Sequence, residues 1–395
     1  MVISVMGQMP GELHKASVFR LRRVMKSLGM LPVGERMFGK VFCNVGLVIA
    51  VGASSYWRFS FDYDFDYDFL NDHFSSTIDL TNFTALAASH LIIVMELLWG
   101  YCCKDLDRQL QTIYFEISVH LGTPDKVNMD RVRSYCNTIY GSLIIRWLCF
   151  IVMTVITNRA LTYYALYSEL VLLARFSEFT LYCAVILFLY QELVLGASNV
   201  LEELHRTRFE LWSIRRLSLE KLAKLQRIHG LLWQSIRCLE RYFRLSLITL
   251  LMKFFLDTSA LPYWLYLSKV QHTEVSIQYY VAIDECIKIL EIVVPCWICA
   301  RCDAMQRKLS SMFYTITTDR RNGQLNMALR RLCLQLSQER FQFSAGGLVE
   351  ITTEMLGKFI FGMISYIVIC IQFSISLRAS NLNKLAQTTL PSAPI

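Results

Sequence analysis

The residues best suited to chemistry in this chain are charged side chains embedded in long apolar stretches. They form three groups: Arg175 with Glu178, Lys253 with Asp257, and Asp284 with Glu285, Lys288 and Glu291. Spacings of three and four residues bring side chains together on one helix face, where opposite charges pair. Ionisable groups within a membrane either pair or face a water-filled cavity. Pairing alone accounts for the second group and for Glu285 with Lys288, whereas the members that we place in the outer half of the membrane could also line a ligand cavity.

Aromatic side chains lie at a similar depth in these stretches. Trp264, Tyr279 and Tyr280 could face the same cavity, or they could belong to the aromatic belt found at membrane–water interfaces. The belt explains them without a ligand, and both interpretations remain open. The candidate ligand pocket predicted from the sequence comprises Arg175, Glu178, Asp257, Trp264, Tyr280 and Asp284.

A second pattern is a stripe of polar residues in the last apolar segment. Its members are Glu354, Lys358, Gly362, Ser365, Ile369, Gln372 and Ser376. Steps of three and four residues place them on one face of a helix, and every member except Ile369 is polar or glycine. Such a stripe either forms hydrogen bonds to neighbouring helices or lines a water-filled path in which Ile369 is a hydrophobic constriction. The pattern alone does not choose between the two.

A run of cysteines and the absence of enzyme motifs bear on chemistry of other kinds. Cys296, Cys299 and Cys302 form a C-x2-C-x2-C run, but a metal site needs a fourth ligand and a loop geometry. The run ends an apolar stretch, so we interpret these cysteines as buried apolar residues. The sequence contains no Walker loop, nucleophile elbow, zinc-protease motif or nucleotide fingerprint. We therefore expect no enzymatic activity, no metal and no other cofactor.

The composition predicts the elements that hold these residues. The 395 residues are 54% hydrophobic and only 18% charged, with a mean hydropathy of +0.38, whereas soluble domains are about one-quarter charged. The fold class is therefore an all-α polytopic membrane protein. A spanning helix needs about 20 apolar residues. Seven segments fit: 40–58, 79–101, 138–160, about 166–197, 243–267, 277–300 and 355–377.

The distribution of Lys and Arg predicts the orientation of these spans. Seven basic residues precede the first span, and the segments after the second, fourth and sixth spans are also basic. The alternate loops contain one basic residue each: Arg58, Arg159 and Lys269. Because cytosolic loops are the basic ones, we predict a cytosolic tail over residues 1–39, a channel domain over 40–377 and an extracellular tail over 378–395. Asn82 begins a glycosylation sequon at the rim of the second span.

Two cytosolic segments, at about 199–241 and 301–350, are predicted to be helical without spanning the membrane. In the second, Leu325, Leu329, Leu332 and Leu336 recur at helical spacing. Such a stripe buries itself against other helices. It could pack within its own chain or between subunits, and we predict that these four leucines form a subunit anchor.

Two motifs near the C-terminus resemble those of the insect gustatory receptor family, within the insect chemoreceptor superfamily. "SYIVICIQF" (365–373) is similar to the family's Thr-Tyr, five apolar residues, Gln-Phe: Tyr366, Gln372 and Phe373 match, and Ser365 replaces Thr while keeping the hydroxyl. "FQFSAGGLVEI" (341–351) resembles Phe-x-Ala-x-Gly-Leu-Phe. Here Phe343, Ala345, Gly347 and Leu348 fit, and Val349 departs from the pattern.

The resemblance implies a tetrameric, ligand-gated, non-selective cation channel in the plasma membrane of chemosensory neurons. It implies that the last helix lines a central pore, that an outer pocket takes a small-molecule tastant and that an inner anchor joins the subunits, of one or several kinds. The partners would be the tastant, the other subunits, the lipid bilayer and permeating cations, with no nucleic acid. The pore residues would be Ser365, Ile369, Gln372, Phe373 and Ser376, and the packing residues Tyr366, Phe343, Ala345 and Gly347.

Two other function classes share the expectation of several membrane helices. A receptor coupled to G proteins needs an outer N-terminus, and such receptors usually have a disulfide between outer loops. No cysteine lies in a loop that we place outside. A transporter would show internal repeats or paired broken helices, and the sequence shows neither.

Overall fold

The computed structural model describes residues 46, 49, 69–99, 103–121, 126–157, 160–206, 212–270, 275–314 and 323–388. Apart from residues 46 and 49, the first predicted span and the N-terminal tail lie outside this set. For some residues near helix ends, only the backbone is described.

The described chain is built from long helices and one short β-hairpin, which confirms the all-α class. The helices are α5 (Phe69–Trp99), α6 (Cys103–His120), α7 (Lys126–Thr157), α8 (Ala160–Arg206), α9 (Trp212–Tyr242), α10 (Arg244–Val270), α11 (Val275–Tyr314), α12 (Gly323–Gln338) and α13 (Thr353–Thr388). The hairpin pairs β1 (Ser344–Ala345) with β2 (Val349–Glu350) in antiparallel register, Ala345 opposite Val349.

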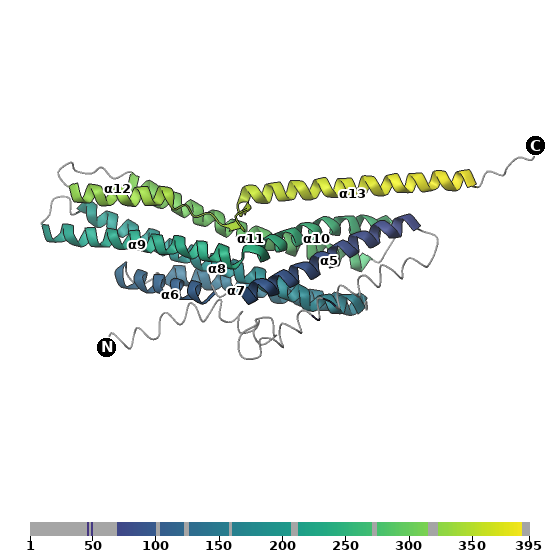
Figure 1. Cartoon of the computed structure of the whole chain (residues 1–395), viewed down its shortest axis with the longest axis horizontal. Coiled ribbons are helices and arrows are strands. Elements are labelled where there is room, and N and C mark those ends of the chain that lie inside the picture. The colour runs from purple at the N-terminus through teal and green to yellow at the C-terminus, as the bar shows by residue number, and fades with distance from the viewer. Residues whose placement is uncertain are drawn as a thin grey trace, which may run out of the picture.

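The molecule is elongated, with two ends of different composition (Figure 1). At one end α6, α9 and α12 lie together, and at the other end α5, α10 and α13 lie together. The 47 residues of α8 and the 40 of α11 connect the two ends. At about 1.5 Å per residue, α8 is about 70 Å long, more than twice the apolar thickness of a bilayer. The predicted fourth and sixth spans are therefore parts of longer continuous helices.

Six helices cover the predicted second to seventh spans. By length and composition, three stretches within the described residues could cross a membrane: Leu80–Leu97, Tyr167–Glu203 and Thr353–Ser376. The total of seven spans and the orientation stay predictions. Several helices extend beyond the predicted spans: α5 begins at Phe69, α7 begins at Lys126 and α13 continues past residue 377 to Thr388.

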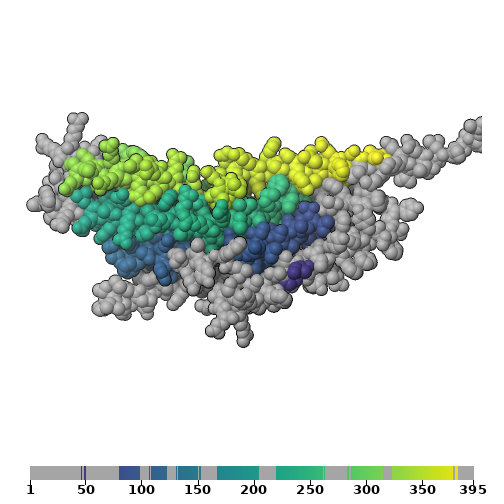
Figure 2. Space-filling view, viewed as in Figure 1, coloured from purple at the N-terminus to yellow at the C-terminus, as the bar shows by residue number. Residues whose placement is uncertain are grey.

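The core surrounds α8, which contacts α5, α6, α7, α9, α10 and α11. From Leu170 to Val194, only Ser177 and Gln191 are partly exposed. A helix that is apolar on nearly all sides belongs in a protein core or in lipid, and the neighbouring helices cover this stretch of α8 on all sides. On the face shown in Figure 2, α12 and α13 form one long edge above α9 and α10.

Burial within the single chain corrects the predicted role of the leucine stripe on α12. Leu329, Leu332 and Leu336 are at most 4% exposed, and Leu325 packs against the same core. They face helices of their own chain, including α9 and α11, and all but the partly exposed Leu325 have almost no surface left for another subunit. A subunit contact by α12 would have to use its opposite face, where Met327 and Leu334 are more than half exposed.

Candidate functional site

The last helix begins at a well-defined N-terminus. The Thr352 hydroxyl accepts a hydrogen bond from the backbone N–H of Met355 at 3.1 Å, as N-cap residues do. Glu354 adds a negative charge in the first turn, which the helix dipole favours. Its carboxylate lies 2.7 Å from the ammonium of Lys358, and both side chains are exposed. The two charges that begin the predicted polar stripe therefore pair with each other.

One face of α13 packs on α10 and the other is uncovered. Phe255 of α10 meets Phe359 and Tyr366 edge-on, with ring centroids 5.4 and 6.3 Å apart. A Cβ at Gly362 would lie 3.2 Å from the Phe255 ring, so a small residue is required for this close approach. Farther along this face, Met363 accepts a hydrogen bond from Thr258 of α10 at 3.2 Å.

The uncovered face of α13 carries the predicted pore residues. Ile369 is 61% exposed and Phe373 is 49% exposed. Gln372 and Ser376 are exposed, and Ser365 is half-buried with its hydroxyl bonded to the Phe361 carbonyl. The structure therefore leaves Ile369, Gln372 and Ser376 on one exposed surface, whereas Gly362 of the same stripe lies in the contact with α10. Tyr366 lies off that surface, in the contact with α10, as the sequence analysis proposed.

The hairpin before α13 rests on the junction between α9 and α10. Phe343 and Ala345 are buried, and both glycines of the turn have positive φ, 61° at Gly346 and 77° at Gly347. A Cβ at Gly346 would lie 2.5 Å from Ile248 and 3.0 Å from the Arg244 carbonyl oxygen. At Gly347, which belongs to the motif, glycine is favoured only by the positive φ. At Gly346 glycine is favoured by the positive φ and also by the lack of room for a side chain. The motif did not identify Gly346.

Two polar side chains, one on α9 and one on α11, attach this hairpin segment to the rest of the chain. The sequence analysis predicted neither of them. Glu240 of α9 accepts hydrogen bonds from the Ser344 N–H at 2.9 Å and from its hydroxyl at 2.7 Å. Gln306 of α11 accepts one from the Phe341 N–H at 2.7 Å and donates one to the Glu339 carbonyl at 2.6 Å. The available signal was Gln306 itself, a single polar residue in the buried stripe of α11.

Arg175 of α8 is the centre of a buried ionic network. Its guanidinium lies 2.8 Å from Glu178 in the same helix and 3.2 Å from Glu96 of α5. Arg175 and Glu178 are 0% exposed. The guanidinium also lies against the rings of Tyr242 and Phe243, 4.1 and 4.0 Å from their centroids. Every direction around Arg175 is therefore occupied by protein.

The network sits where α9 and α10 are interrupted at Phe243. Arg175 donates a hydrogen bond to the Tyr242 carbonyl at 2.7 Å. Glu96 accepts bonds from the backbone N–H groups of Leu245 at 2.7 Å and Ser246 at 3.2 Å, and from the Ser246 hydroxyl. Helix ends leave such backbone groups without partners inside the helix. Arg175 and Glu96 thus supply from other helices the partners that the interrupted helix lacks.

This geometry, taken with the predicted orientation, bears on the depth of Arg175 and Glu178. They lie level with Glu96, near the end of α5, and with Ser246, in the first turn of α10. Under the predicted orientation both helix ends are cytosolic, so the pair is not in the outer half. Helix α8, with 47 residues, is far longer than a single span.

A second ionic cluster lies farther along α10. Lys253 pairs with Asp257 in the same helix and lies 3.4 Å from Glu169 of α8. Beside it, Arg146 of α7 pairs with Glu291 of α11. These charges join α7, α8, α10 and α11, and the cross-helix partners were not predicted.

A small cavity of about 10 Å³ lies within the second cluster, lined by Arg146, Glu169, Lys253 and Asp257 with apolar neighbours. That is about the space one water molecule needs. Asp257, one of the predicted pocket residues, lines this cavity. The side chains of Trp264, Tyr280 and Asp284 lie outside the described residues, so the predicted ligand pocket stays a prediction.

Two further sequence features are placed as follows. Asn82 lies within α5, with its side chain partly exposed; its glycosylation stays a prediction. Cys296, Cys299 and Cys302 are buried on α11, and Cys299 contacts Cys183 of α8. The cysteine run thus contributes to the contact between the two longest helices.

Comparison with known proteins identifies the family. The 7tm Chemosensory receptor family model matches residues 18–377. "Putative gustatory receptor 98a" of Drosophila melanogaster is 71% identical over 393 residues, which cover 99% of this chain and 100% of that protein. "Putative gustatory receptor 98b" of the same species is 23% identical over 219 residues, 54% of each chain.

Among solved structures, the insect olfactory receptor OR5 from Machilis hrabei has the same fold. Its complex with eugenol aligns with a TM-score of 0.60 at 10% identity, covering 90% of this chain and 99% of that one. A second structure of the same receptor aligns with a TM-score of 0.59, 10% identity and the same coverage. The family model and the relative aligned along its full length establish that this chain belongs to the insect gustatory receptor family of chemosensory receptors.

Proposed function

We propose that this chemoreceptor is a subunit of a tetrameric, ligand-gated, non-selective cation channel that detects small-molecule tastants. The observation that most directly supports this proposal is the arrangement of α13. One face packs on α10, and a polar stripe on the flank of that face is not covered by the described chain, beside exposed apolar residues such as Phe361 and Val368. A polar surface in lipid is costly. Four copies of α13 facing a common axis would place this stripe against water.

The order of residues along the stripe supports a gate and a site for ions. Under the proposed orientation α13 runs outward, so Gln372 lies beyond Ile369 by about 4.5 Å. A ring of Gln amides can replace part of a cation's hydration without holding it tightly, and a ring of Ile side chains can close a path by excluding water. Phe373, exposed beside the stripe, would border the same path.

The second ionic cluster supports the position of the tastant pocket. Lys253, Asp257, Arg146 and Glu291 bring four helices together on the outer side of the interruption at Phe243. The cavity there has room for about one water molecule, so a tastant could enter only if these side chains moved. A tastant that rearranges these charges would displace α10. Because α13 packs on α10, that movement would reach the candidate pore helix.

The experiment measures pore exposure residue by residue. The chain is expressed alone, a tastant panel identifies an activating compound, and single-channel currents are recorded. Ile369→Cys and Gln372→Cys should each make the current sensitive to a water-soluble, charged methanethiosulfonate reagent. Val368→Cys is the matched control, because Val368 is also exposed but lies about 100° around the helix from Ile369. Equal effects at all three positions, or none, would contradict the pore assignment.

The orientation has a separate test. An epitope tag at residue 1 should be reached by antibody only after cells are permeabilised, and a tag after residue 395 should be reached on intact cells. The opposite pattern would remove the channel proposal and favour the class of receptors that couple to G proteins.

A further inference from the structure

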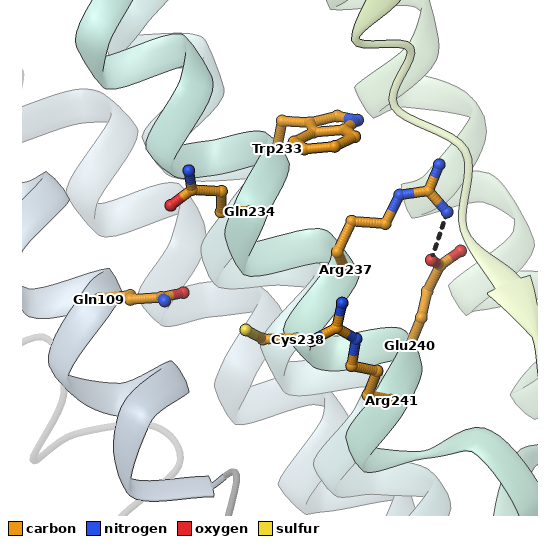
Figure 3. A pocket seen from close by; sticks show the side chains of 7 residues that line it. All are labelled: Gln109, Trp233, Gln234, Arg237, Cys238, Glu240 and Arg241. Atoms are coloured by element: carbon orange, nitrogen blue, oxygen red, sulfur yellow. Dashed lines mark hydrogen bonds and ion pairs between the residues drawn. The ribbon is translucent and has the colours of Figure 1, made fainter.

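An open cavity of about 630 Å³ lies along α9 next to α6, with Gln109 on the α6 side and Trp233, Arg237 and Glu240 on the other side of α9 (Figure 3). Gln109 contributes from α6, and Trp233, Arg237, Glu240 and Arg241 contribute from α9. Its volume lies within the range of small-molecule sites. The proposed channel function uses none of these side chains for its pore or its tastant pocket.

The two arginines in this cavity differ in their surroundings. Arg237 donates to Glu240 at 2.9 Å, and its guanidinium lies 5.4 Å from the centre of the Trp233 ring. These contacts orient the side chain, which is still 48% exposed. Arg241 is exposed, and no carboxylate among the described residues pairs with it. The cavity lining therefore has a surplus of positive charge at Arg241 and an oriented guanidinium at Arg237.

The chemistry of the lining selects a phosphorylated ligand. A guanidinium presents parallel N–H donors that match the oxygens of a phosphate group, and two guanidiniums on successive helical turns match a ligand with more than one phosphate. The Gln109 amide adds a neutral polar group, and the Trp233 ring adds a flat apolar wall. The single acid, Glu240, is already engaged by Arg237 and Ser344.

The location favours a lipid as the source of that phosphate. Arg241 lies three residues before the start of α10 at Arg244, which is also exposed. The sequence places the cytosolic end of the fifth span at this point, so under the proposed orientation the cavity lies level with the inner-leaflet headgroups. Anionic phospholipids concentrate there and attract basic residues next to membrane spans.

We propose that this cavity binds the phosphorylated headgroup of an anionic inner-leaflet lipid, with Arg237 and Arg241 as its phosphate ligands. A phosphate competes with Glu240 for Arg237. Glu240 also holds Ser344 of the hairpin that leads into α13. The lipid would therefore act next to the contact that joins the anchor to the candidate pore helix.

The test measures lipid binding to the full-length receptor purified in nanodiscs. The probe is a fluorescent short-chain phosphatidylinositol bisphosphate, and binding is followed by microscale thermophoresis. Arg237→Gln with Arg241→Gln should weaken binding at least tenfold. The matched control is Arg330→Gln with Arg331→Gln, two exposed arginines of α12, and it should change affinity by less than twofold. Glu240→Gln should strengthen binding several-fold, because the competing carboxylate is gone while an acceptor for Ser344 remains.

The outcomes separate this site from its alternatives. Soluble inositol trisphosphate should bind at least tenfold more weakly than the lipid; equal binding would keep the phosphate site but overturn the lipid as its source. Equal weakening by the two double variants would reveal general attraction to basic surface and overturn the site, as would the absence of saturable binding. Gel filtration and the thermal midpoint of each variant establish that it is folded. The binding assay does not depend on channel activity, so failure of the channel proposal would be recognised separately.

Discussion

Helices α8 and α13 are both long and strongly apolar, yet the folded chain treats them in opposite ways. In α8, 94% of the apolar window in Tyr167–Glu203 is buried, whereas in α13 only 17% of the window in Thr353–Ser376 is buried. In α8 the buried Arg175 and Glu178 belong to a closed network, whereas in α13 Gln372 and Ser376 lie on an exposed face. Apolar character alone therefore does not distinguish a helix buried in the core of the chain from a helix that is largely exposed in the single chain.

The largest expected effect is the loss of the charge at the centre of α8. Arg175→Met would leave Glu96 and Glu178 buried without their cation and the Tyr242 carbonyl without its donor. Removing one partner of a buried pair costs about 3–5 kcal/mol, so we expect little folded receptor at the cell surface. Surface labelling and fluorescence-detected gel filtration measure this. Adding Glu96→Gln and Glu178→Gln to the same variant should restore part of the yield; if the single variant folds normally, α8 is not held by this network.

Truncating one apolar side chain in each helix should destabilise the receptor much more in the buried α8 than in the exposed α13. Leu189 of α8 is 0% exposed and Ile369 of α13 is 61% exposed. Leu189→Ala should cost about 2–5 kcal/mol because it removes buried contacts and leaves a cavity. Ile369→Ala should leave the thermal midpoint of the isolated subunit within the error of measurement. Similar shifts for both variants would mean that α13 is as buried as α8, and the comparison would fail.

The hairpin tests how α13 is attached despite its small buried area. Gly346→Ala and Gly347→Ala both place a side chain at positive φ, which costs about 1–3 kcal/mol. Only at Gly346 would the new Cβ also collide with Ile248 and the Arg244 carbonyl. We therefore expect the larger fall in thermal midpoint, and the larger change in gating, for Gly346→Ala. An equal response would mean that backbone strain alone matters and that the close contact with α10 does not.

The smallest effect is expected at the exposed pair that begins α13. Lys358→Met removes the partner of Glu354, but both side chains are exposed and solvent screens their attraction. The thermal midpoint should not change measurably. A clear loss of stability would indicate that this end of α13 is covered in the assembled receptor, which native gel electrophoresis of the same variant would test.

Periodicity within one helix was the part of the structure that the sequence could predict. The stripe on α13 and the leucine stripe on α12 both fall on single faces, because spacing along a helix determines direction. The spacing predicts which side chains share a face, but it does not predict what that face contacts. Leu329 and Leu332 are buried in their own chain, whereas Ile369 is exposed. The predicted partners within a helix, such as Glu178 for Arg175, also occur.

Contacts between distant segments could not be read from spacing. Glu96 is 79 residues from Arg175, and Glu240 is 104 residues from Ser344. Their meeting depends on the lengths and docking of several helices. Gly346 shows the same limit, because its requirement for a small residue comes from Ile248 and Arg244, not from its own turn.

The interruption at Phe243 also has a consequence for the order of biogenesis. Ribosomes make Glu96 first, then Arg175 and Glu178, and the Tyr242–Ser246 segment last. Until that segment emerges, the two acids and one base carry a formal charge of −1. The backbone groups that form hydrogen bonds with Arg175 and Glu96 in the folded chain do not yet exist. The growing chain must therefore keep these residues hydrated or shielded for the time needed to synthesise about 70 more residues. The arrival of the first turn of α10 gives Glu96 the neutral hydrogen-bond donors that its buried carboxylate lacks until then.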